Sequence, residues 1–111
     1  MSFAPHEYLR HILTERDYLI KESVGLMFDE FMANETLRRA FVRSLEIIGE
    51  AAKNVPDDFR AQNPSVEWRT MAGMRDRLIH GYFGIDYELV WEVVEIRIPV
   101  LRDQIAAILG A

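Results

Sequence analysis

The sequence predicts an all-α fold, and three observations support this prediction. Apolar residues recur at helical spacing along almost the whole chain. No segment shows the sustained alternation of β-branched residues that a half-buried strand requires. Residues that begin or end helices separate the apolar stripes at short intervals. With 111 residues, half of them apolar, the chain is expected to form one helical domain spanning residues 1–111.

The first long helix is expected from Pro5 to about Val24, because proline suits a first helical turn. Its apolar stripe consists of Tyr8, Ile12, Leu19 and Val24, with Leu9, Leu13 and Ile20 beside them. A short helical piece is expected within Gly25 to Ala33, where Leu26, Phe28 and Phe31 are the large apolar residues.

The second long helix is expected to begin after Asn34, a residue type that caps helix N-termini, and to end at Pro56. Its core face contains Leu37, Phe41, Leu45, Ile48, Ala52 and Val55. The following stretch "PDDFRAQNPS" is expected to be a loop, because it combines two prolines with Asp and Asn. The adjacent carboxylates Asp57 and Asp58 are therefore attributed to turn chemistry rather than to catalysis.

Ser65 is expected to cap a third long helix from Val66 to about Ile79, with Gly81 and Gly84 marking its end. The last helix should begin at Asp86, and its apolar stripe contains Val90, Trp91, Val94, Ile98, Leu101, Ile105 and Ile108. Pro99 lies within that stripe, so a kink is expected there. Three long helices and a kinked fourth predict an antiparallel four-helix bundle with a short accessory helix.

Composition excludes several functional classes. The net charge is -5, so a general electrostatic coat for nucleic acid is not expected. Of the 13 basic residues only two are lysine, and arginine is the better fork for phosphate, so a local basic groove stays open. The absence of cysteine excludes disulfides, thiolate metal sites and thiol nucleophiles, and it fits a reducing cytoplasm. The amino-terminal residues lack a signal-peptide pattern, and "IAAIL", the longest apolar run, is too short to span a bilayer.

The stretch "MRDRLIHGYFG", from Met74 to Gly84, concentrates residue types suited to phosphate chemistry. Arg75 and His80 are five residues apart, which is about 140° of rotation on a regular helix, so they do not share a face. They could meet if Gly81 unwinds the helix end, or if two copies of the helix pair antiparallel. Tyr82 is seven residues from Arg75 and could share its face. The alternative is a surface arginine and a histidine that caps the helix C-terminus, where a cation is favourable.

Other candidates have structural explanations. Arg38, Arg39 and Arg43 form a second basic cluster, but Glu35, Glu46 and Glu50 on the same helix favour a solvated charged face. His6 and His11 lack a partner at metal-ligand spacing and are expected at the surface, so neither a metal nor a cofactor is expected. Trp68 and Trp91 lie on the apolar stripes and are expected in the core or at a dimer interface.

The motif region resembles a known family. "RDRLIHGY" matches the pattern Arg-x4-His-x-Tyr, and it lies within "GMRDRLIHGYFGIDYELVW" (73–91), between Trp68 and Pro99. "RSLEIIGEAAKNVP" (43–56) is similar to the second long helix of the same family. Over nearly its whole length the chain resembles the HepT toxins, a branch of the HEPN ribonuclease superfamily.

The resemblance implies a metal-independent endoribonuclease that acts as a homodimer, with the motifs of both chains around one cleft. Arg75 would then hold the scissile phosphate and stabilise the charge that builds on it. His80 would transfer protons at the ribose 2′-hydroxyl or the leaving oxygen, which gives cyclic phosphate products. Asp76 stands where the family usually has a polar residue and could orient Arg75 or repel RNA. Arg77 could add phosphate affinity or be solvated.

Tyr82 matches a tyrosine that, in the family, is adenylylated by a partner nucleotidyltransferase antitoxin of the MntA type. AMP there would add bulk and negative charge two residues from His80. The alternative for Tyr82 is packing of its ring on the end of the bundle. The resemblance thus implies the toxin of a type VII-like toxin–antitoxin pair with RNA as substrate. The alternative functions are a non-catalytic helical bundle that binds a nucleotidyltransferase or a nucleotide, and a dimerising scaffold.

Overall fold

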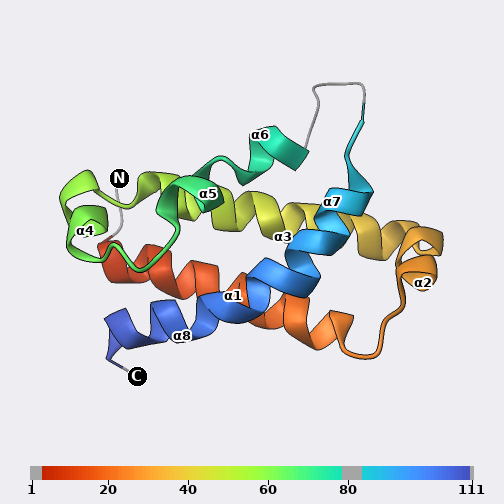
Figure 1. Ribbon diagram of the computed structural model, residues 1–111, viewed down its shortest axis with the longest axis horizontal. Helices are drawn as coiled ribbons and strands as arrows, with labels where there is room; N and C mark the ends of the chain where they lie inside the picture. Colours follow the sequence, from red (N-terminus) through yellow and green to blue (C-terminus); the bar gives the residue numbers. More distant parts are fainter. Residues whose placement is uncertain (1–3, 79–83, 111) are drawn as a thin grey trace.

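The computed structural model describes residues 4–78 and 84–110, and the regular elements of this part of the chain are helices, which confirms the all-α class (Figure 1). In chain order they are α1 (Pro5–Ser23), α2 (Phe28–Ala33), α3 (Glu35–Asn54), α4 (Asp57–Gln62), α5 (Trp68–Ala72), α6 (Met74–Leu78), α7 (Tyr87–Glu92), a π-helical turn (Val93–Arg97) and α8 (Ile98–Leu109).

The core is built around α1. Figure 1 shows α1 and α3 running alongside each other in opposite directions, and α1 packs against both α3 and α8. The predicted stripes supply its side chains, which are completely buried at Leu9, Ile12, Leu19, Phe41, Leu45, Ile48, Val90, Ile98 and Ile105. The far side of α3 contacts α5 and α6, the helices that lead into the motif. The four-helix-bundle arrangement and the homodimer stay predictions.

The predicted helix starts are confirmed at three positions. Pro5 occupies the first turn of α1. The side chain of Asn34 accepts a hydrogen bond of 3.0 Å from the backbone N–H of Leu37 at the start of α3. The side chain of Asp86 accepts one of 3.1 Å from Leu89 at the start of α7. Each of these caps satisfies a backbone donor that the first helical turn leaves without an intrahelical acceptor.

The prediction of a loop at "PDDFRAQNPS" was wrong, because α4 occupies its first half. Asp57 and Asp58 lie in the first turn of this helix, where negative charge is favourable against the helix dipole. Asp57 also forms an ion pair with Arg60 one turn later. Prolines on either side of a short polar stretch resemble a loop in sequence, and here they delimit a helix of less than two turns.

The predicted helix from Val66 to Ile79 was also wrong in its start and its continuity. The cap position of α5 is Glu67 rather than Ser65, and it makes no side-chain capping hydrogen bond. Val66 and Trp68 are both buried. On a regular helix, side chains two residues apart would point about 200° away from each other. A non-helical backbone at Glu67 places both side chains in the core. The indole N–H of Trp68 then donates to the carbonyl of Asn63 at 2.9 Å.

Gly73 separates α5 from α6, and the chain turns there instead of continuing one helix. Glycine costs about 1 kcal/mol relative to alanine in a helix interior, so the break falls where the helix is weakest. A second glycine supports the same region from α3. A Cβ atom at Gly49 would lie 3.0 Å from the carbonyl oxygen of Met71, which is tighter than an ordinary van der Waals contact, so glycine favours this close approach of the α3 and α5 backbones.

The kink expected at Pro99 takes the form of the π-helical turn that immediately precedes α8. The backbone N–H of Ile98 bonds to the carbonyl of Val93, five residues earlier. Proline cannot donate a backbone hydrogen bond, and its ring crowds the carbonyl four residues before it. The wider turn accommodates both effects without ending the helical path.

Aromatic side chains join α2, α3 and α7. The ring of Phe31 lies 5.2 Å from that of Phe41 and 5.3 Å from that of Trp91, measured between centroids. Phe28 packs edge-on to Trp91 at 5.9 Å. Trp91 is partly buried against the core, which agrees with its place on the predicted stripe. This cluster holds α7, and therefore the downstream end of the motif region, against the rest of the molecule.

Candidate functional site

Arg75 lies on α6 with half of its side chain exposed (52%). Its Nε atom is 3.9 Å from a carboxylate oxygen of Glu46 on α3, and its Nη1 atom is 3.8 Å from Asp76. Both distances are near the limit for an ion pair, and half-exposed pairs of this kind contribute little to stability. The contact with Asp76, whose side chain is far more exposed than that of Glu46, is the one that a phosphate group can replace at little cost.

Glu46 lies between two arginines. The same Oε2 atom that faces Arg75 is 3.9 Å from Nη1 of Arg43. Only about a quarter of the Glu46 side chain is exposed (27%), so it is better shielded from water than either arginine. From the sequence, Glu46 counted only as one of the acids that make the arginine-rich face of this helix solvated. Its proximity to Arg75 depends on the packing of α3 against α6, and no local pattern predicts that.

His80 and Tyr82 lie outside the described residues, so the structure does not test their predicted meeting with Arg75. What it does describe is both ends of the segment that contains them. The backbone N–H of Asp86 donates to the carbonyl of Leu78 at 2.9 Å, which joins the end of α6 to the start of α7. Gly84 has a φ of 128°, a conformation that favours glycine. The described residues on the two sides of positions 79–83 are thus joined by a backbone hydrogen bond.

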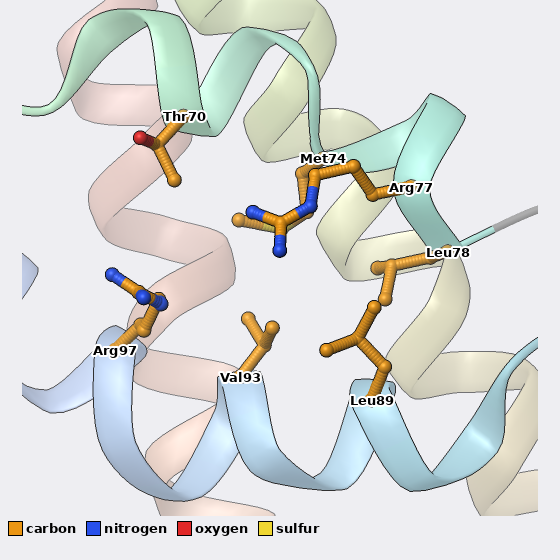
Figure 2. Close-up of a pocket in the computed structure, with 7 residues that line it drawn as sticks. All are labelled: Thr70, Met74, Arg77, Leu78, Leu89, Val93 and Arg97. Atoms are coloured by element: carbon orange, nitrogen blue, oxygen red, sulfur yellow. The ribbon is translucent and has the colours of Figure 1, made fainter.

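Arg77 faces different neighbours from Arg75, because side chains two residues apart on a helix point about 200° away from each other. Together with Arg97 of the π-helical turn it lines a groove between α5 and α6 on one side and α7 with that turn on the other (Figure 2). Nη1 of Arg97 is 3.6 Å from a carboxylate oxygen of Glu67. The sequence singled out Arg77 as a supporting residue but gave no sign of Arg97.

The second basic cluster divides into three different environments. Arg39 forms an ion pair of 2.7 Å with Glu35, as expected for a charged face, and Arg43 faces Glu46. Arg38 differs from the expectation of a solvated residue. Its guanidinium carbon lies 5.1 Å from the centre of the Tyr87 ring, and it donates to the carbonyl of Met32. Arg38 therefore helps to fasten α7 to α3.

Metal and membrane chemistry gain no support from the described residues. His6 and His11 are exposed, as predicted, and His6 packs edge-on to Phe59 at 5.9 Å. Across residues 4–78 and 84–110, no group of three or more His, Asp or Glu side chains is arranged to hold a metal ion. Within the same ranges, no helix combines the length and the apolar character needed to cross a bilayer.

Comparison of the whole sequence shows which family this helical chain belongs to. The family model described as "Ribonuclease HepT-like" matches residues 12–108. The chain belongs to this HepT-like ribonuclease family, as the resemblance of its motifs predicted.

Named relatives agree with this assignment. A protein of Caldanaerobacter subterraneus subsp. tengcongensis, named "Putative RNase", is 50% identical over 105 residues, covering 95% of this chain and 94% of the relative. "Probable ribonuclease HepT" of Thermococcus cleftensis is 41% identical over 104 residues, covering 94% of each chain. A Methanocaldococcus jannaschii protein, also described as a "Putative RNase", is 45% identical over 92 residues, covering 83% of this chain and 76% of its own. No solved structure matches the chain.

Proposed function

We propose that the protein is a metal-independent endoribonuclease and the toxin of a toxin–antitoxin pair. Membership in the HepT-like family supports the reaction class. The observation that most directly supports the site is the half-exposed guanidinium of Arg75, which among the described residues forms long ion pairs with Glu46 and Asp76. An arginine in that state can exchange a carboxylate for a phosphate at little cost, as a transition-state clamp requires.

In the proposed reaction the ribose 2′-oxygen attacks the neighbouring phosphorus while its proton passes to a histidine imidazole. The bond between phosphorus and the 5′-oxygen breaks, and that oxygen leaves with a proton from a second imidazole or from water. The products are a 2′,3′-cyclic phosphate and a free 5′-hydroxyl. His80 is the residue assigned to proton transfer, because imidazole titrates near neutral pH. Arg75 binds the non-bridging oxygens as charge accumulates on them.

The proposed assembly is a homodimer of helical bundles with the two motifs around one cleft. Two copies would supply two arginines and two histidines to a single RNA linkage. This arrangement removes the difficulty that residues 75 and 80 do not share a face on a regular helix. The partner in regulation is a cognate MntA-type nucleotidyltransferase, which would attach AMP to Tyr82. The phenolic oxygen would bond to the α-phosphorus of ATP as pyrophosphate leaves, and the added charge would repel the substrate phosphate.

The test is incubation of the purified protein with total RNA in excess EDTA. The proposal predicts cleavage by the wild type, loss of cleavage in His80→Ala and Arg75→Ala, and fragments whose 3′ ends carry a cyclic phosphate by mass spectrometry. Arg102→Ala, which removes an exposed arginine from α8, is the matched control and should cleave like the wild type. Cleavage that survives the loss of His80, or that EDTA abolishes, would contradict the proposal.

A further inference from the structure

A groove on the side of α6 opposite Arg75 brings two arginines together over an apolar floor. Figure 2 shows the guanidinium of Arg77 reaching over the gap from α6, and that of Arg97 rising from the π-helical turn on the other wall. The remaining lining residues are Thr70, Met74, Leu78, Leu89 and Val93. The interior of the groove has a volume of about 10 Å³, which is room for at most one water molecule. It therefore cannot admit a base or a sugar. Only the charged mouth of the groove is available to a ligand.

The charges at this mouth are not balanced. Among the described residues, Arg97 pairs with Glu67 at 3.6 Å, whereas Arg77 has no ion-pair partner. Two guanidinium groups at the same mouth repel each other, although water weakens this repulsion because both arginines are exposed. An anion bound between the two guanidinium groups would convert this repulsion into a net attraction. Arginine forks match the oxygens of phosphate, so a phosphate group is the anion that suits this mouth.

The position of the groove relative to Arg75 indicates which phosphate would bind there. Arg75 and Arg77 project from opposite sides of the same short helix, so one strand crossing α6 can contact both. A helix with its side chains is about 10 Å across, which is a distance of one or two nucleotides along an extended strand. We propose that Arg77 and Arg97 form a subsite for a backbone phosphate of single-stranded RNA, one or two nucleotides from the phosphate at Arg75. This inference rests on the proposed ribonuclease function.

The experiment measures binding of a fluorescent single-stranded RNA in the non-cleaving His80→Ala background, over a series of salt concentrations. Arg97→Ala and Arg77→Ala should each weaken binding several-fold and reduce the slope of log K against log salt by about 0.7, the value for one phosphate contact on a single strand. Arg102→Ala is the control and should change neither quantity. Equal affinities and slopes in the Arg97→Ala and Arg102→Ala proteins would overturn the subsite.

A second variant gives a result that damage to the fold cannot imitate. Glu67→Gln removes the carboxylate that competes for Arg97, so it should tighten RNA binding by about two- to fivefold, the worth of a surface ion pair. Unchanged or weaker binding by Glu67→Gln would contradict the proposal even if Arg97→Ala proved unstable.

A neutral methylphosphonate placed at each RNA linkage in turn locates the contact. One linkage close to the scissile position should weaken binding to the parent protein but not to the Arg97→Ala variant. If every linkage behaves alike in both proteins, the subsite is contradicted. Failure of the proposed function is distinguishable, because it appears as absence of cleavage by the wild type in EDTA, whatever the binding results.

Discussion

At the scale of single residues, two carboxylates near Arg75 have different roles. Glu46 is largely shielded and pairs with both Arg43 and Arg75, whereas the side chain of Asp76 is 86% exposed and, among the described residues, pairs with Arg75. A shielded acid between two cations fixes their positions, because removing its charge leaves the cations to repel each other. An exposed acid is screened by water and mainly adds negative potential where RNA must approach.

We therefore predict different kinetic effects for two isosteric substitutions. Glu46→Gln should lower kcat about tenfold, because Arg75 loses its orientation, and should leave KM unchanged or lower. Asp76→Asn should leave kcat within about twofold and lower KM, because one negative charge is removed beside the substrate. Steady-state cleavage of a short RNA measures both constants. If Glu46→Gln behaves like Asp76→Asn, Glu46 does not position Arg75.

The sequence predicted part of this site and omitted the rest for a physical reason. Arg75, Asp76 and Arg77 are recognisable because they belong to one contiguous motif. Glu46 lies far before that motif in the sequence, and the packing of α3 against α6 brings it near. Arg97 follows the motif after another helix, and it comes near because the π-helical turn faces α5 and α6 across the groove. His80 and Tyr82 stay predictions, because they lie outside the described residues.

At the scale of the helices, local chemistry predicted the starts, and tertiary packing decided the breaks. Asn34 and Asp86 cap their helices as their residue types indicate, since a cap involves only the next three residues. The late start of α5 follows from burial of Val66 together with Trp68, which depends on the surrounding core. The break at Gly73 lies beside the close approach of α3 at Gly49, which no helical periodicity reveals.

Gly49→Ala tests this close approach. Alanine should add up to about 1 kcal/mol of helix propensity to α3, but its Cβ would press on the carbonyl of Met71, and overpacking costs about 1–3 kcal/mol. We expect a net loss of about 1 kcal/mol or more in the free energy of unfolding, measured by urea denaturation. Lys53→Ala, an exposed substitution on the same helix, should stay within about 0.5 kcal/mol. A stabilised Gly49→Ala protein would show that α5 yields easily and that the glycine is not required for packing.

At the scale of the whole molecule, an acidic protein carries a local arginine surface. A net charge of -5 disfavours general binding to nucleic acid, so affinity must come from a few well-placed contacts. Arg75 and the pair Arg77–Arg97 lie on the two sides of α6, the helix that contains the first residues of the motif. The all-α class followed from periodicity alone. The proposed dimer could not be predicted in the same way, because the periodicity of one chain gives no information on how a second copy would pack against it.

The most direct test of the central claim is RNA cleavage in EDTA by a mixture of two inactive proteins, Arg75→Ala and His80→Ala, after their subunits have exchanged. About half of the dimers would then contain one chain of each kind. If the site is shared between subunits, each such dimer retains one Arg75 and one His80 from different chains. We predict that each variant alone is inactive and that the mixture recovers a substantial fraction of wild-type cleavage. A mixture that exchanges subunits but stays inactive would contradict a site built by two chains.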